Sequence, residues 1–215
     1  MNETSHADWE RGKAEHKKLS DTVANRYDEL YEDANFATGS YMRFELETIG
    51  RIRTPNTAVA VDLGCGTGLA AAAFAREVDY FIGIDLSPRM IERARSSGLY
   101  AQLEVAEMVE GLRSKPDASA EIVLAADAMV YLSDLAPVLH EVKRVLVTGG
   151  LLAFTVETHR GDGVMLGEGL RYAHAAPYVR ASIRDAGLAL SQFEELSARN
   201  EDNVPAPGLV VVATR

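Results

Sequence analysis

From residue 57 to residue 213, short apolar runs rich in β-branched and aromatic residues alternate with stretches of helical periodicity. Such alternation is typical of crossover units, in which a helix connects two parallel strands. We therefore expect an α/β fold, doubly wound around a mostly parallel sheet. The predicted strands are residues 57–63, 80–85, 100–105, 121–127, 150–157, 188–196 and 208–213.

Helix signals lie between these strands. Ser87-Pro88 offers an N-cap and a proline for the first turn of a helix after the second strand. The apolar stripe of residues 135–146 predicts a helix that packs on the sheet and ends before Gly149-Gly150. A further helix is expected at residues 177–187, after a glycine-rich insert at 159–176. The insert is too rich in glycine to form a rigid side of a binding site, so we expect it to be a mobile lid over the acceptor.

The pattern before residue 55 differs. Residues 1–18 are polar and predict a frayed tail or a solvated helix, whereas residues 20–31 and 40–52 carry apolar residues at helical spacing. We expect two parts, an N-terminal helical segment at 1–54 and a core at 55–215.

Composition limits the function classes. The 215 residues are 47% hydrophobic, enough for one buried core. The net charge is −10 and the cationic residues do not cluster, so a nucleic-acid partner is not expected. No signal-peptide core or membrane-spanning apolar run occurs, which predicts a soluble cytoplasmic protein without a membrane partner. Cys65 is the only cysteine, which excludes an internal disulfide and a cysteine-rich metal site.

The stretch Asp62-Leu-Gly-Cys-Gly-Thr-Gly68 lies between the first strand and a helix. Backbone N–H groups and the helix dipole converge at such a turn, which suits an anionic or polar ligand. Its G-x-G-x-G spacing differs from the G-x-G-x-x-G of dinucleotide sites, and no Lys-Ser or Lys-Thr follows to make a P-loop. A purely structural turn is the alternative, although three glycines exceed what a tight turn requires.

Asp62–Gly68 resembles the first motif of the class I S-adenosylmethionine-dependent methyltransferases. Phe81–Met90 and Leu103–Met108 are similar to the second and third motifs, and Val145–Leu152 to the segment that leads into the fifth strand. The resemblance covers residues 20–215. It implies a seven-stranded Rossmann-like sheet with an antiparallel last strand, methyltransferase activity and S-adenosyl-L-methionine as cofactor.

A narrower resemblance lies in Ala125–Leu132 and Arg171–His174. These segments are similar to those of small bacterial methyltransferases that are sometimes fused to tetratricopeptide repeats, although this chain carries no such repeat.

The cofactor has chemically different ends, and each needs its own partner. The glycine loop would face the amino acid end, with Asp62 near the ammonium group. Asp85, at the end of the second strand, can accept from the ribose hydroxyls, or can serve the helix start beside Ser87. Leu86 and Met90 would flank the adenine, or belong to the core.

The remaining cofactor candidates follow from the resemblance. Glu107 would accept from the adenine amino group, at a position where the family more often has Asp, and Met108 would donate its N–H. Tyr27 and Tyr31, four residues apart, would close over the cofactor or simply pack on the core. The complete set expected at the cofactor is Tyr27, Tyr31, Asp62, Gly64, Cys65, Gly66, Gly68, Asp85, Leu86, Met90, Ala106, Glu107, Met108 and Ala126.

The acceptor is expected beyond the fourth and fifth strands. Methyl transfer from a sulfonium needs proximity, alignment and a deprotonated or neutral nucleophile. Asp127, His159 and His174 are the candidate general bases, with His174 preferred because a closing lid could carry it onto the acceptor. Alternatively, Asp127 caps a turn, His159 is solvated and His174 holds a loop.

Some acceptors are disfavoured. Ala126-Asp-Ala-Met129 replaces the Asn-Pro-Pro-Tyr of many base-methylating enzymes, and Glu157-Thr158 offers only part of a catechol-type metal site. We expect a small-molecule acceptor, methylated on oxygen or nitrogen, and no metal. A protein that binds the cofactor without methyl transfer and acts through a partner is the second hypothesis, and the glycine spacing disfavours a nicotinamide oxidoreductase.

Overall fold

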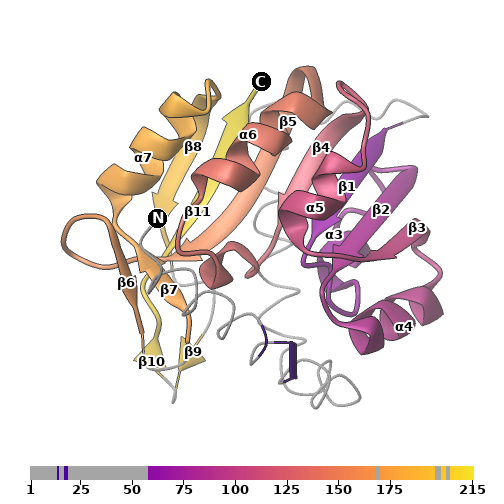
Figure 1. Cartoon of the computed structure of the whole chain (residues 1–215), viewed down its shortest axis with the longest axis horizontal. Coiled ribbons are helices and arrows are strands. Elements are labelled where there is room, and N and C mark those ends of the chain that lie inside the picture. The colour runs from indigo at the N-terminus through magenta and orange to yellow at the C-terminus, as the bar shows by residue number, and fades with distance from the viewer. Residues whose placement is uncertain (1–13, 15–16, 19–57, 168–169, 197–199, 202–203) are drawn as a thin grey trace.

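The computed structural model describes residues 14, 17–18, 58–167, 170–196, 200–201 and 204–215. Seven strands of its main sheet are ordered β3-β2-β1-β4-β5-β11-β8 (Figure 1). The four pairings among β1 to β5 are parallel, and β11 is antiparallel to both β5 and β8. The predicted fold class is confirmed. These strands are β1 (Val59–Leu63), β2 (Tyr80–Asp85), β3 (Tyr100–Val105), β4 (Ala120–Ala125), β5 (Leu146–Glu157), β8 (Ala189–Glu195) and β11 (Gly208–Thr214).

Helices cover both faces of the sheet. Val123 packs with the helices on one face, whereas its neighbour Leu124 packs with Phe74 on the other, because successive side chains of a strand point to opposite faces. A stretch of strand that is buried on both sides is apolar throughout, as β4 is from Ile122 to Ala125. The helices are α3 (Leu69–Ala73), α4 (Pro88–Ser97), α5 (Met108–Arg113), α6 (Ala136–Val145) and α7 (Ala176–Asp185), with a 3-10 helix at Met129–Tyr131.

The predicted helix signals act as expected. Ser87 Oγ accepts a hydrogen bond from the Met90 N–H at 3.2 Å, Pro88 is the first residue of α4, and Gly98 ends the helix with a φ of +70°. The apolar stripe of α6 is fully buried against the sheet. The sequence did not predict α5.

The glycine-rich insert contains two strands that the sequence analysis missed. β6 (Val164–Leu166) and β7 (Tyr172–His174) form an antiparallel hairpin, and Ala173 of β7 pairs with Glu157 of β5. This pairing to the sheet argues against a freely mobile lid. A separate two-stranded sheet consists of β9 (Asn200–Glu201) and β10 (Val204–Pro205).

The parallel strands end at one edge of the sheet, at the bottom of Figure 1. The loops after β1, β2, β3, β4 and β5 therefore meet there, as in other open α/β sheets. The two N-terminal helices expected within residues 1–54, with Tyr27 and Tyr31, lie outside the described residues. No helix in the described ranges is long and apolar enough to cross a membrane.

Candidate active site

The glycine loop, residues 64–68, connects β1 to α3 and packs closely on its neighbours. The N–H groups of Gly64 and Cys65 donate to the Ile84 carbonyl of β2 at 2.8 and 3.1 Å. Gly64 has a φ of +65°, and a Cβ added there would lie 2.6 Å from the Cβ of Ala128. Only glycine fits, and its absent side chain lets the loops after β1 and β4 meet.

Asp85 ends β2 directly beside this loop. Its Oδ2 accepts from the Gly66 N–H at 2.9 Å, and its Oδ1 accepts from the Ser87 N–H at 2.8 Å. Asp85 thus supports the turn before α4, as one reading of the sequence expected, and also orients the loop. A carboxylate can accept about four hydrogen bonds, so these contacts are compatible with further acceptance from a ligand.

Asp62 lies beneath the loop and is only 1% exposed. Its Oδ2 accepts from the hydroxyl of Tyr100 at 2.7 Å. Burial raises the pKa of Asp62 to about 7, the Tyr100 hydrogen bond lowers it, and Asp85 raises it. Tyr100 received no role from the sequence.

Three side chains expected at the cofactor differ in exposure. Met90 is 2% exposed. The Cys65 side chain is also buried, and it packs in a small apolar cluster with Ile91. Burial also raises the pKa of the Cys65 thiol. These positions favour core roles for both side chains, and leave the half-buried Leu86 as the better placed of the two adenine candidates.

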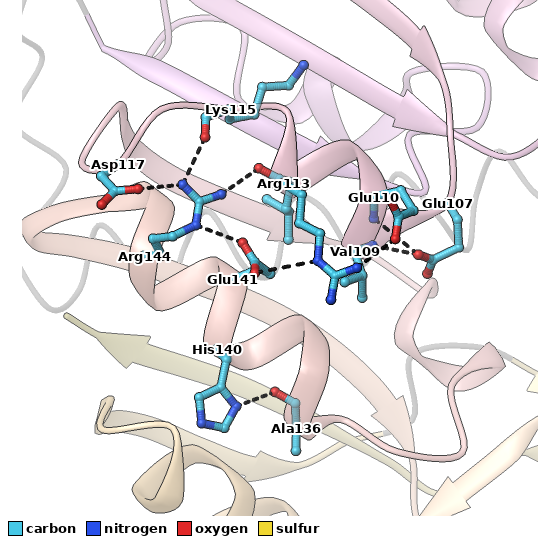
Figure 2. A network of polar contacts seen from close by, with 11 residues as sticks. Glu107, Val109, Glu110, Arg113, Lys115, Asp117, Ala136, His140, Glu141 and Arg144 are labelled. Atoms are coloured by element: carbon cyan, nitrogen blue, oxygen red, sulfur yellow. Dashed lines mark hydrogen bonds and ion pairs between the residues drawn. The ribbon is translucent and has the colours of Figure 1, made fainter.

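Glu107 caps α5 at the same edge. Its Oε2 accepts from the N–H groups of Val109 and Glu110 at 2.9 and 3.2 Å (Figure 2). The side chain therefore has a structural function that the sequence analysis did not predict, and the cap fixes its place at the start of α5.

Three smaller contacts complete this half of the site. The Ala106 N–H donates to the Asp85 carbonyl at 3.0 Å. A Cβ added at Gly64 would lie 3.5 Å from Cε of Met108. Ala126 is half-buried after β4 and packs against the core. The structure thus brings the loops after β1, β2, β3 and β4 together.

The far end of α5 is held separately. Arg144 of α6 donates to Asp117 at 2.6 Å, to Glu141 at 2.8 Å and to the carbonyls of Leu112 and Lys115 (Figure 2). This network fixes the end of α5 away from Glu107, so both ends of the helix are anchored.

On the acceptor side, Arg171 connects three segments. Its Nη2 donates to Asp127 after β4, its Nε to Glu157 at 2.5 Å, and its Nη1 to the Tyr131 hydroxyl at 2.9 Å. Arg171 is 8% exposed. Burial lowers the pKa of its guanidinium, but Asp127, Tyr131 and Glu157 outweigh this effect and raise it. Asp127 has a φ of +52°, and its N–H donates to Thr155 Oγ1 at 2.8 Å.

The two candidate histidines have different surroundings. His174 is 0% exposed, and its Nε2 donates to the Leu132 carbonyl at 2.8 Å. Burial lowers the pKa of His174 to about 4. These contacts favour its alternative role of holding the chain. His159 is half-buried, and its Nε2 is buried without a hydrogen-bond partner among the described residues.

Two residues that organise the site were missed, Tyr100 and Arg171. An arginine within a glycine-rich insert is a weak signal of a functional role. Asp127 and Glu157, which follow β4 and end β5, are carboxylates that could have been recognised as its partners. Nothing in the sequence pointed from Tyr100 to Asp62. Within the part of the chain that the structure describes, no group of three or more His, Cys, Asp or Glu residues could hold a metal ion.

Known proteins resemble this chain in sequence. Residues 61–154 match the profile of a methyltransferase domain. Methyltransferase-like protein 27 from Homo sapiens is 30% identical over 137 residues, 62% of this chain and 52% of that protein. The 27-O-demethylrifamycin SV methyltransferase from Amycolatopsis mediterranei is 28% identical over 152 residues, 64% of this chain and 56% of that enzyme. The chain thus spans about half the length of these curated relatives.

The fold has solved counterparts. The crystal structure of magnesium protoporphyrin IX methyltransferase from Synechocystis PCC 6803, with bound S-adenosylmethionine, is similar with a TM-score of 0.72 and 13% identity. The similarity covers 95% of this chain and 97% of that chain. The fold described above is therefore that of S-adenosylmethionine-dependent methyltransferases.

Proposed function

We propose that this chain, whose residues 61–154 match a methyltransferase domain, binds S-adenosylmethionine and transfers its methyl group to oxygen or nitrogen of a small molecule. The observation that carries the proposal is the contact between the glycine loop and Asp85, in which Gly66 donates to the carboxylate at 2.9 Å. This contact sets a backbone cradle beside a carboxylate, as a zwitterionic ligand with a ribose requires.

The residues present fit such a ligand. A Cβ added at Gly66 would meet no atom of the described residues within 4 Å, so the space beside the loop is open to a ligand, and the left-handed φ of +52° is what favours glycine there. The buried hydroxyl of Thr67, the next residue, has no hydrogen-bond partner among the described residues. A buried polar group without a partner is costly, and a polar ligand at the loop would supply one.

Each end of the ligand has a partner in this proposal. The N–H groups of Gly64, Cys65, Gly66 and Gly68 already donate within the protein, so the Thr67 hydroxyl and Asp62 would bind the amino acid end beside the loop backbone. Asp85 would hold the ribose hydroxyls, and Leu86 and Glu107 would contact the adenine. When bound, S-adenosylmethionine supplies an activated methyl group on a sulfonium. The protein's task is to hold an acceptor in line with that methyl group, because proximity and alignment supply much of the rate.

The acceptor would lie at the ends of β4 and β5. Asp127 and His159 are the groups there that can take a proton from a nucleophile, and Arg171 positions Asp127. The relative from Amycolatopsis is named for O-methylation of a small molecule, which supports that class of acceptor. The narrower kinship with methyltransferases fused to tetratricopeptide repeats remains a hypothesis that rests on the 125–132 and 171–174 segments.

Calorimetric titration with S-adenosylmethionine, S-adenosylhomocysteine and NAD tests the cofactor. We expect micromolar binding of S-adenosylhomocysteine, about −8 kcal/mol, and no binding of NAD. A screen of metabolite pools with a labelled methyl group then tests transfer. Tight cofactor binding without label in any pool would favour the second hypothesis, a binding protein that acts through a partner.

A further inference from the structure

Tyr100 contacts Asp62 across an intervening strand. The sheet order is β3-β2-β1, and Tyr100 begins β3 whereas Asp62 lies in β1. The phenolic oxygen of Tyr100 nevertheless lies 2.7 Å from Oδ2 of Asp62. The side chain must therefore pass over β2.

Two glycines make room for this passage. Gly83 of β2 pairs with Asp62 in register, and a Cβ added at Gly83 would lie 2.8 Å from Cε1 of Tyr100. A Cβ added at Gly68 would lie 3.0 Å from Cε2 of the same ring. The ring therefore lies between Gly83 and the glycine loop, directly below the backbone that would bind the cofactor.

Asp85 of β2 is a second carboxylate, and its charge opposes that of Asp62. Cys65 in the loop is a buried thiol, and burial raises its pKa and so favours its neutral form. Burial and Asp85 both raise the pKa of Asp62, and the Tyr100 hydrogen bond lowers it. Among these groups, Tyr100 is the one that favours the ionised carboxylate.

We propose that Tyr100 is a positioning residue that holds Asp62 as a carboxylate for the ammonium group of the cofactor's amino acid end. This inference rests on the proposed function. An ammonium group pairs with ionised Asp62 and not with the protonated acid, so affinity should rise with pH through the titration of Asp62. Since the pKa of Asp62 is about 7, affinity should rise about tenfold between pH 6 and pH 8.

The test compares Tyr100→Phe with the wild-type chain by titration between pH 5.5 and 8.5. Two probes are used, S-adenosylhomocysteine and 5′-methylthioadenosine, which lacks the amino acid end. Phenylalanine keeps the ring and removes only the hydrogen bond, so the inflection for S-adenosylhomocysteine should move up by about one pH unit. Methylthioadenosine affinity should stay within about twofold of wild type and be independent of pH, since a neutral probe gains nothing from an ionised carboxylate. Tyr80→Phe, at an exposed tyrosine of β2, is the matched control.

Asp62→Asn is a second variant. It should abolish the pH inflection of S-adenosylhomocysteine affinity and leave the affinity for methylthioadenosine unchanged. An unshifted inflection in Tyr100→Phe would overturn the inference, as would an equal loss of affinity for both probes at every pH. Either outcome would leave the proposal of cofactor binding intact. Failure of the wild-type chain to bind either probe would instead overturn the proposed function, and the inference with it.

Discussion

The Nε atom of Arg171 lies 2.5 Å from Oε1 of Glu157, which ties the β6–β7 hairpin to the end of β5. The same guanidinium also binds Asp127 and the Tyr131 hydroxyl, through its other two nitrogens. A planar guanidinium donates from three nitrogens in fixed directions, whereas a lysine ammonium donates from a single atom and cannot reach three acceptors placed this way. The shape of the acceptor side therefore depends on one buried side chain.

Replacing Arg171 should destabilise the fold. Arg171→Met would leave the partly buried carboxylates of Asp127 and Glu157 without their cation, and such a loss typically costs about 3–5 kcal/mol. Arg171→Lys should recover only part of it, because a single ammonium cannot reproduce the three contacts. Urea unfolding measures both, with Arg184→Met at an exposed arginine of α7 as the control. Equal midpoints for Arg171→Met and the control would show that the ion pairs add no stability.

Removing the Asp85 carboxylate should weaken cofactor binding. Asp85→Ala deletes the acceptor for the Gly66 and Ser87 N–H groups as well as the proposed ribose contact. We expect a loss of about 1.5–3 kcal/mol in S-adenosylhomocysteine affinity, and a smaller loss for Asp85→Asn, which keeps one acceptor oxygen. Glu92→Gln, on the exposed face of α4, should titrate like wild type. An unchanged curve for Asp85→Ala would remove Asp85 from the ribose role.

His174 should make stability depend on pH. Its pKa is about 4 in the fold against 6.5 as the ordinary value, so the unfolded chain binds the additional proton between these limits. The contribution of neutral His174 is complete above pH 6.5 and is lost as pH falls towards 4, about 3 kcal/mol in all.

His174→Gln can still donate to the Leu132 carbonyl but does not titrate, so its free energy of unfolding should fall less steeply below pH 6.5 than that of wild type. Urea unfolding at pH 7.5, 5.5 and 4.5 measures the difference. His140→Gln, at an exposed histidine of α6, should follow the wild-type curve. Parallel curves for His174→Gln and wild type would contradict the role assigned to its burial.

The sheet could be predicted because its signals are local. β1, β2, β4 and β5 each carry a short apolar run, and the cap at Ser87-Pro88 depends only on residues nearby in sequence. The β6–β7 hairpin was missed because its strands have three residues each. Its stability depends on pairing with β5 and on the contact of Arg171 with Asp127, which lies 44 residues away in sequence.

Contacts between candidate site residues could be predicted only where a motif fixes the backbone. The glycine loop and Asp85 lie together as expected, since a strand, a turn and the next strand determine their places. The preference for His174 depended on a lid, and its complete burial favours a structural role instead. Tyr100 could not be predicted, because its contact with Asp62 depends on the register of three strands and on the missing side chain of Gly83.

Asp127 and His159 are the candidates for removing a proton from the acceptor. If Asp127 or His159 is the general base, Asp127→Asn or His159→Gln should lower kcat by about 100- to 10,000-fold and leave cofactor affinity almost unchanged. His174→Gln serves here as the comparison, and we expect it to keep its turnover because its side chain is sealed from the acceptor side.

A residue that only positions the acceptor would behave differently, raising KM while the pH profile of kcat keeps its inflection. Asp127→Asn also weakens the ion pair with Arg171, so Arg171→Lys must be measured beside it. If Asp127→Asn lowers kcat and removes the inflection whereas Arg171→Lys only raises KM, the carboxylate itself takes the proton. If Asp127→Asn and His159→Gln both keep kcat within about threefold of wild type, no general base acts from these positions, and proximity and alignment of an already neutral or deprotonated nucleophile must account for the rate.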